Sequence, residues 1–175
     1  MKKFILIFAI IFFPICANSQ IISGGVEYNS EIAQQEMINS KPAEFDKNLI
    51  KTNLLDKNHN ENIATLLQGN TELKDRTLAL FSDGSYGVIY KNDKQNVWYY
   101  NNQGVLTHNE IKTSLTYPYK TYKYSTNGTL VNMSLRISDT ESYVFDNSGK
   151  LLAHWVGNYC YDSSGNIIMT RKIMK

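Results

Sequence analysis

Phe145-Asp-Asn-Ser-Gly149-Lys-Leu151 contains the pattern that decides the fold: an aromatic residue, a turn-former, two polar residues, glycine, any residue and an aliphatic residue. The pattern recurs as Tyr100-Asn-Asn-Gln-Gly104-Val-Leu106, Tyr124-Ser-Thr-Asn-Gly128-Thr-Leu130 and Tyr161-Asp-Ser-Ser-Gly165-Asn-Ile167. Asp, Asn or Ser favours the first position of a type I turn, and glycine adopts the left-handed conformation at the fourth with little strain. Each copy therefore predicts a β-hairpin with a three-residue loop and a bulge.

The loop length also sets the register of each predicted hairpin. The residue before the turn-former must lie opposite the second residue after the glycine. The predicted pairs are Tyr100 with Leu106, Tyr124 with Leu130, Phe145 with Leu151 and Tyr161 with Ile167. Each sets an aromatic residue against an aliphatic one, a cross-strand pair that stabilises a sheet by about 0.2–1 kcal/mol. Gly104, Gly128, Gly149 and Gly165 are thus predicted to be structural turn residues.

Strands are predicted on both sides of these turns and along the rest of the second half of the chain. The predicted strands are Thr77–Phe81, Tyr86–Lys91, Val97–Tyr100, Val105–Ile111, Thr121–Tyr124, Leu130–Ile137, Tyr143–Phe145, Lys150–Val156, Tyr159–Tyr161 and Ile167–Lys172. Consecutive hairpins with short links form an antiparallel meander. The expected fold class is mainly β, an antiparallel β-meander of repeated hairpins over residues 76–175, with a small helical N-terminal segment.

Aromatic residues mark the boundary of that segment. Only Tyr28 and Phe45 are aromatic within residues 20–80, whereas residues 81–175 contain fifteen Phe, Trp or Tyr residues. Because aromatic and β-branched side chains favour sheets, residues 20–75 are predicted to form helices and loops.

Local signals within residues 20–75 place two helices. Ser30 is the predicted N-cap of a helix that reaches Ile38, and Ser40 with Pro42 opens a second helix. The polar run 57–62 predicts a loop.

The first nineteen residues have the features of a secretory signal peptide. Two lysines precede the apolar run Phe4–Ile15, and the small residues Ala17 and Ser19 follow it. This order predicts cleavage after Ser19, export to the periplasm, cell surface or medium, and no transmembrane span afterwards. A retained membrane anchor and acylation of Cys16 are the alternatives, although the apolar run is shorter than the ~20 residues of a spanning helix.

The net charge argues against nucleic acid as a partner. The chain has 18 Lys plus Arg and 16 Asp plus Glu, a formal charge of +2. Because the predicted signal peptide contains two of the lysines, the mature chain is neutral and lacks the net field that attracts phosphates.

The aromatic-Asp-x-x-Gly-x-Leu unit, clearest in Phe145–Leu151 and Tyr161–Ile167, resembles the YD repeat of bacterial secreted and cell-surface proteins. It is also similar to the MORN-type variant repeats, in which aromatics precede a glycine-containing turn, as Trp98, Tyr99 and Tyr100 do here. The resemblance covers about residues 97–170. It implies a hairpin scaffold or binding surface and brings no catalytic residue, while the spacing of the copies is less regular than in either family.

Candidate chemistry centres on one cysteine. Cys160 is the only cysteine of the predicted mature chain, so a buried free thiol is expected there. With His154 it forms the candidate pair of a small secreted hydrolase. A two-residue loop at Gly157-Asn158 would pair Trp155 with Cys160 and turn His154 to the opposite face, whereas a three-residue loop would bring His154 and Cys160 to one face.

The sequence contains no pattern for a metal or a cofactor, because the histidines are far apart and His-x-x-x-His and Cys-x-x-Cys spacings are missing. No catalytic residue is assigned.

The candidate partner-binding residues are Trp98, Tyr99, Tyr100 and Trp155, since exposed aromatic faces stack on sugars and proteins. The alternative is that they fill the core. The sequence thus favours a secreted, non-enzymatic module that binds a protein or a cell-envelope component.

Overall fold

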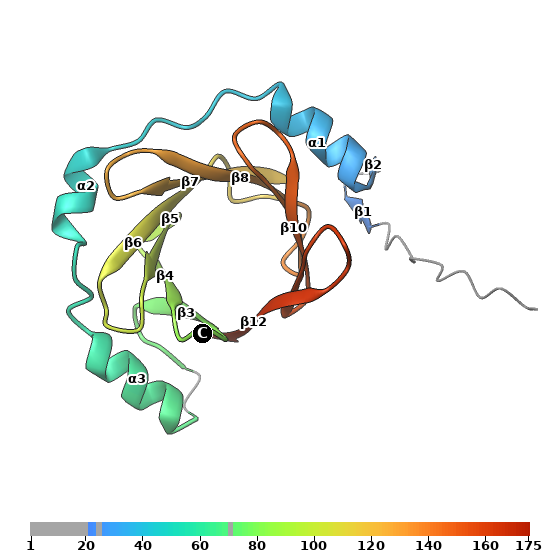
Figure 1. Cartoon of the computed structure of the whole chain (residues 1–175). Coiled ribbons are helices and arrows are strands. Elements are labelled where there is room, and N and C mark those ends of the chain that lie inside the picture. Colours follow the sequence, from blue (N-terminus) through green and yellow to red (C-terminus); the bar gives the residue numbers. More distant parts are fainter. Residues whose placement is uncertain (1–20, 24–25, 70–71) are drawn as a thin grey trace, which may run out of the picture.

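A closed antiparallel β-barrel dominates the computed structural model, which describes residues 21–23, 26–69 and 72–175 (Figure 1). The strands are β3 (Arg76–Phe81), β4 (Tyr86–Tyr90), β5 (Asp93–Tyr100), β6 (Leu106–Lys112), β7 (Tyr119–Ser125), β8 (Leu130–Arg136), β9 (Glu141–Phe145), β10 (Leu151–Val156), β11 (Tyr159–Tyr161) and β12 (Ile167–Met174). The predicted signal peptide and Cys16 lie outside the described residues.

Neighbours in the sequence are neighbours in the barrel. Each strand from β3 to β12 pairs with the next, and β12 then pairs with β3, with Arg171 opposite Phe81 and Met174 opposite Leu78. The expectation of a mainly β chain of consecutive antiparallel hairpins is confirmed, and each predicted strand overlaps an observed one. The closure goes further than the predicted meander, because it leaves no edge unpaired among the barrel strands β3 to β12.

Five turns of one kind lie at the same end of the barrel, which we call the glycine-turn end. In each, a glycine with positive φ donates its N–H to the carbonyl three residues earlier: Gly84 to Phe81, Gly104 to Asn101, Gly128 to Ser125, Gly149 to Asp146 and Gly165 to Asp162. The four predicted cross-strand pairs are all confirmed. The pattern missed the turn at Gly84 because the order there is reversed, with aliphatic Leu80 opposite aromatic Tyr86.

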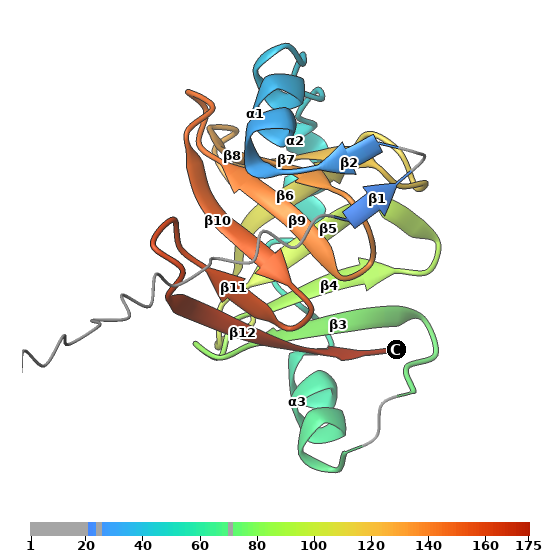
Figure 2. The ribbon, with the colours of Figure 1, turned by 90° about the vertical axis from the view of Figure 1, so that its right-hand side faces the viewer.

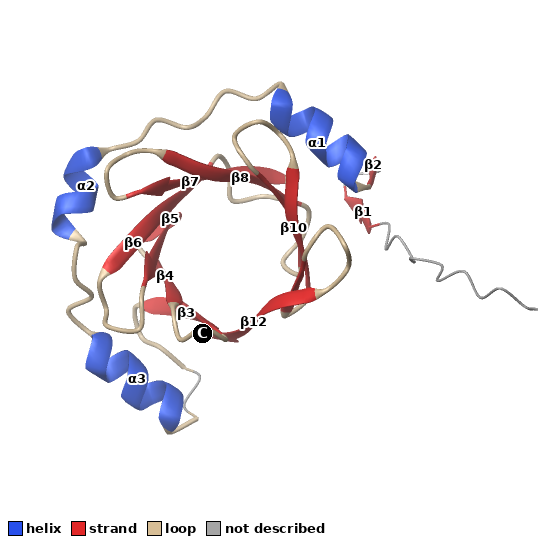
Figure 3. Ribbon diagram, in the orientation of Figure 1, coloured by secondary structure: helices blue, strands red, loops and turns tan. Residues whose placement is uncertain are grey.

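The N-terminal segment wraps around the outside of the barrel (Figures 1 and 3). It consists of β1 (Ile21–Ser23), β2 (Val26–Tyr28), α1 (Ser30–Ile38), α2 (Lys47–Thr52) and α3 (His59–Leu67). Four details correct the sequence predictions. β1 and β2 pair as a two-stranded antiparallel sheet in a segment that was predicted to form only helices and loops. Asn29, not Ser30, caps α1, and Asp46 caps the second helix, which begins later than predicted. The predicted loop 57–62 contains the first turn of α3, held by a 2.6 Å hydrogen bond from Asn62 Nδ2 to Asp56 Oδ2.

The hydrophobic core lies between this segment and the outer face of the barrel. Figure 2 shows α1 on the outside of the barrel, near β8. Met37 of α1 packs in one cluster with outward-facing residues of β7, β8 and β9, and Ile50 of α2 packs in a second with residues of β4 and β5. The outward side chains in these clusters include Tyr86, Trp98, Tyr100, Tyr122, Tyr124, Leu135 and Phe145. The inner face of the barrel is therefore left to other side chains.

Candidate functional site

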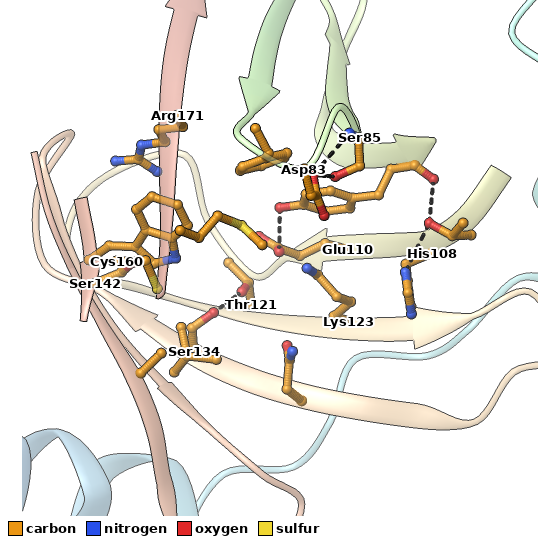
Figure 4. A pocket seen from close by; sticks show the side chains of 18 of the residues that line it. Asp83, Ser85, His108, Glu110, Thr121, Lys123, Ser134, Ser142, Cys160 and Arg171 are labelled. Carbon is orange, nitrogen blue, oxygen red and sulfur yellow. Dashed lines mark hydrogen bonds between the residues drawn. The ribbon is translucent and has the colours of Figure 1, made fainter. Parts of the chain in front are cut away.

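The inner face of the barrel is lined by polar and charged residues as well as aromatics. Because side chains alternate along a strand, a strand with an aromatic outer face can present a polar inner one. On β7, Tyr122 and Tyr124 belong to the outer core, whereas Thr121 and Lys123 border an internal cavity. The cavity has a volume of about 470 Å³ and reaches the turns of the glycine-turn end, where Asp83 borders it (Figure 4).

Two walls of different chemistry enclose the cavity. The apolar wall comes from β3, β5 and β10–β12 and contains Phe81, Tyr99, Ala153, Trp155, Cys160 and Met169. The polar wall comes from β6–β9 and contains Thr107, His108, Glu110, Thr121, Lys123, Asn132, Ser134, Arg136 and Ser142. On the polar wall the hydroxyls of Thr121 and Ser134 form a hydrogen bond of 2.7 Å (Figure 4). Such a site offers both apolar area and hydrogen-bonding groups to one ligand.

Tyr99 links the two walls. Its hydroxyl donates a 2.9 Å hydrogen bond to Glu110 Oε2, and the Lys123 ammonium lies 3.8 Å from the centroid of its ring. Burial and the Glu110 carboxylate raise the pKa of Tyr99, so the hydroxyl keeps its proton and acts as a donor. Burial lowers the pKa of Lys123, while the charge of Glu110 opposes that shift.

Arg171 lies on the apolar wall. Its guanidinium stacks 4.6 Å from the centre of the Trp155 ring, and its Nη2 donates a 2.8 Å hydrogen bond to the Gly157 carbonyl. Its buried Nε has no hydrogen-bond partner among the described residues. Burial, together with the nearby charge of Arg136, lowers the pKa of Arg171. Arg136 itself is held by main-chain carbonyls, with 3.0 Å from Nε to Ser138 and 2.7 Å from Nη2 to Asp139.

The structure separates the two residues of the proposed hydrolase pair. The loop at Gly157-Asn158 has two residues, so Trp155 pairs with Cys160 and His154 pairs with Tyr161 on the opposite face. His154 Nε2 lies 2.8 Å from Glu141 Oε1, and its imidazole stacks on Tyr143 of the outer core. Cys160 is a buried free thiol that borders the cavity, and burial raises its pKa to about 11.

The four candidate partner-binding residues do not form an exposed strip. Trp98 and Tyr100 are only 2% and 1% exposed, because the N-terminal segment covers the outer face of β5. Tyr99 and Trp155 border the internal cavity instead. The alternative, in which the aromatics are buried, holds for Trp98 and Tyr100. The sequence left exposure and burial open for these residues, because a period-two pattern does not tell which face of a strand is covered.

Sequence reasoning also missed the charged residues of the cavity. Lys123, Arg136 and Arg171 lie on strands that were predicted, at positions that a sheet with one solvated face would present to water. The available signal was the alternation of Thr121 and Lys123 with aromatic neighbours, which defines two faces without saying which one is internal.

A second, smaller cavity of about 330 Å³ is bordered by residues of β3–β7 and of the loops between them. Its lining includes Lys91, Lys94, Lys112, Tyr117 and Tyr119.

Among the residues that the structure describes, no cluster of three or more His, Cys, Asp or Glu side chains could hold a metal ion. No described helix is both long and apolar enough to span a membrane.

The fold and site define a class: an up-and-down antiparallel β-barrel that is closed around an internal cavity. Barrels of about this size are filled by side chains or enclose one small ligand. Comparison of the chain with protein-family models, curated proteins and solved structures found no match. The resemblance to YD and MORN-type repeats therefore stays a prediction from the motif, and the function must be inferred from the cavity.

Proposed function

We propose that the chain is an exported, non-enzymatic binding protein that holds a small molecule inside its barrel. The cavity of about 470 Å³ carries this proposal, because it combines aromatic and hydrogen-bonding walls. Cavities of roughly 300–1,000 Å³ hold organic ligands of ordinary size, and a few polar groups within them set the ligand's orientation. Export is inferred from the sequence of residues 1–19.

The two faces of the barrel carry different kinds of side chain, and this difference supports the proposed function. The apolar core lies on the outer face, where α1 and α2 pack against tyrosines and aliphatic residues. Charged residues on the inner face contribute nothing to that core, and enclosing them costs stability. A site that binds a ligand explains why Glu110, Lys123 and Arg171 lie there together.

The state of Cys160 supports binding rather than catalysis. A thiol with a pKa of about 11 is protonated at neutral pH, and only the thiolate is a nucleophile. His154 faces away from Cys160 and contacts Glu141 instead. The proposed partner is accordingly a small internal ligand, in place of a protein docked on exposed aromatics.

A pair of tryptophan variants tests the proposal. Asn132 borders the cavity, and the preceding residue, Val131, is exposed. The neutral dye N-phenyl-1-naphthylamine becomes fluorescent in apolar sites and serves as the probe. We expect Asn132→Trp to weaken its binding at least about tenfold, ~1.4 kcal/mol, because the indole occupies the cavity. Val131→Trp should bind as the wild type does; equal affinity in all three proteins, or no binding by the wild type, would contradict the proposal.

A further inference from the structure

Positive charge exceeds negative charge among the residues that line the cavity. Lys123, Arg136 and Arg171 border it together with one carboxylate, that of Glu110, while Asp83 is exposed at the mouth. No described carboxylate lies at salt-bridge distance from any of the three cations. Enclosed cations without a counter-ion are unfavourable, and an anion bound beside them would be favoured.

Lys123 has no hydrogen-bond acceptor among the described residues. Its Nζ contacts the face of the Tyr99 ring at 3.8 Å, and Figure 4 shows it pointing toward the middle of the cavity. Glu110 does not fill this role: its Oε2 accepts a hydrogen bond from the Tyr99 hydroxyl, and neither of its oxygens lies at hydrogen-bond or salt-bridge distance from Lys123 Nζ. An ammonium group has three donors, so Lys123 keeps donors for a ligand.

Arg171 is only partly satisfied by the protein. Nη2 donates to the Gly157 carbonyl, Nε is buried without a partner, and Nη1 has no hydrogen-bond partner in the described part of the chain. Stacking on Trp155 holds the guanidinium plane in place. A planar guanidinium with free donors beside an aromatic ring suits an anionic group attached to an apolar body.

We propose that the ligand is a small amphipathic anion whose charged group binds between Lys123 and Arg171 and whose apolar body packs against Phe81, Trp155 and Met169. This inference rests on the proposed function, since it names the chemistry of the ligand for the same cavity. Arg136 adds long-range attraction while its Nε and Nη2 donate to the carbonyls of residues 138 and 139.

Two dyes with nearly the same ring system separate charge from apolar contact. 1-Anilinonaphthalene-8-sulfonate is an anion, and N-phenyl-1-naphthylamine lacks the sulfonate. We expect Lys123→Met and Arg171→Met each to reduce the affinity for the anionic dye about tenfold or more relative to the neutral dye. Lys172→Met is the matched control, because Lys172 is the exposed neighbour of Arg171 and pairs with Leu80 of the outer core. It should leave the ratio of the two affinities unchanged.

The outcomes of these titrations distinguish a wrong ligand charge from a wrong binding function. If the neutral dye binds and Asn132→Trp blocks it, but the ratio stays constant in both charge variants, the anionic ligand is ruled out and the binding function stands. If neither dye binds the wild type, the proposed function fails first. A change of ratio in Lys112→Met alone would place the anion at the second cavity and overturn the assignment to Lys123 and Arg171.

A measurement on the wild type remains decisive if a charge variant does not fold. Naphthalene-1-sulfonate, 1-naphthoate and 1-naphthyl phosphate are titrated against bound N-phenyl-1-naphthylamine, with neutral 1-naphthalenemethanol as the reference. We expect at least one anion to displace the dye at about a tenth of the concentration that the alcohol requires, and the order among them to identify the acid group. Equal displacement by the alcohol and all three anions would overturn the proposal.

Discussion

The Tyr86 hydroxyl donates a 2.9 Å hydrogen bond to Oδ2 of Asp56, across the junction between the barrel and the N-terminal segment. His59 Nδ1 lies 3.0 Å from the same hydroxyl oxygen. Because the hydroxyl proton is already directed at Asp56, the His59 Nδ1–H is the donor of this second hydrogen bond. Both Tyr86 and Asp56 are buried. This contact therefore attaches the segment around α3 to the outer face of β4.

Tyr86→Phe should weaken that attachment. The change removes a hydrogen bond to a charged group and leaves His59 Nδ1 without its partner, at a cost of about 1.5–3 kcal/mol in the free energy of unfolding. Tyr159→Phe is the control, because Tyr159 is 49% exposed and should lose less than about 0.5 kcal/mol. Urea unfolding followed by circular dichroism measures both; equal stability of the two variants would show that the Asp56 contact contributes nothing.

Gly128→Ala and Gly165→Ala should differ although both glycines close the same turn. They have φ values of +91° and +83°, so alanine strains the backbone at either position by about 1 kcal/mol. At Gly128 a Cβ would also lie 2.9 Å from Phe45 Cε1, whereas at Gly165 it would meet nothing within 4 Å. Because Phe45 packs against both core clusters, we expect Gly128→Ala to be the more destabilising.

Thermal or urea unfolding of the two glycine variants decides the matter. Similar losses would mean that Phe45 moves aside without cost and that the N-terminal segment is only loosely packed on that turn.

Cys160 should react slowly with iodoacetamide at pH 7.5. Its folded-state pKa is about 11, so the thiolate fraction, and with it the alkylation rate, should rise about tenfold per pH unit until the pH approaches 11. Mass spectrometry of the peptide that contains Cys160 follows the reaction, and the protein in urea is the control, with an ordinary thiol pKa near 8.5. A folded-state rate that levels off near pH 9 would contradict the raised pKa.

The same shift makes a linked prediction about stability. Because folding raises the pKa of the Cys160 thiol, its contribution is fully present below the unfolded-state pKa and is lost as the pH rises from about 8.5 toward 11. Cys160→Ser should therefore flatten the decline of unfolding free energy over that range. An identical pH dependence in wild type and variant would contradict the linkage.

Export should remove the first nineteen residues. We expect the protein recovered from the periplasm or medium to begin at Gln20, within one or two residues, as measured by intact-mass spectrometry. Acylated Cys16 at the start of the chain would support the lipoprotein alternative, and an intact Met1 in exported material would contradict cleavage altogether.

Much of the barrel could be predicted from the sequence because its hairpins are set locally. Four residues define each glycine turn, and the turn then dictates that Phe145 lies opposite Leu151 and Tyr124 opposite Leu130. The turn at Gly84 joins two strands that were also predicted, Thr77–Phe81 and Tyr86–Lys91, although it does not match the repeated pattern, because its aliphatic residue precedes the turn and its aromatic residue follows it.

Closure and sidedness were decided only by the tertiary structure. Pairing of β12 with β3 sets Arg171 opposite Phe81, and this contact depends on twist accumulated over every intervening strand. The alternation of Tyr122 and Lys123 along β7 establishes two faces, but only the packing of α1 and α2 on the outside makes the tyrosine face the core and the lysine face the cavity. Strand register follows from a turn of four residues, whereas the inside of a barrel exists only once distant strands have met.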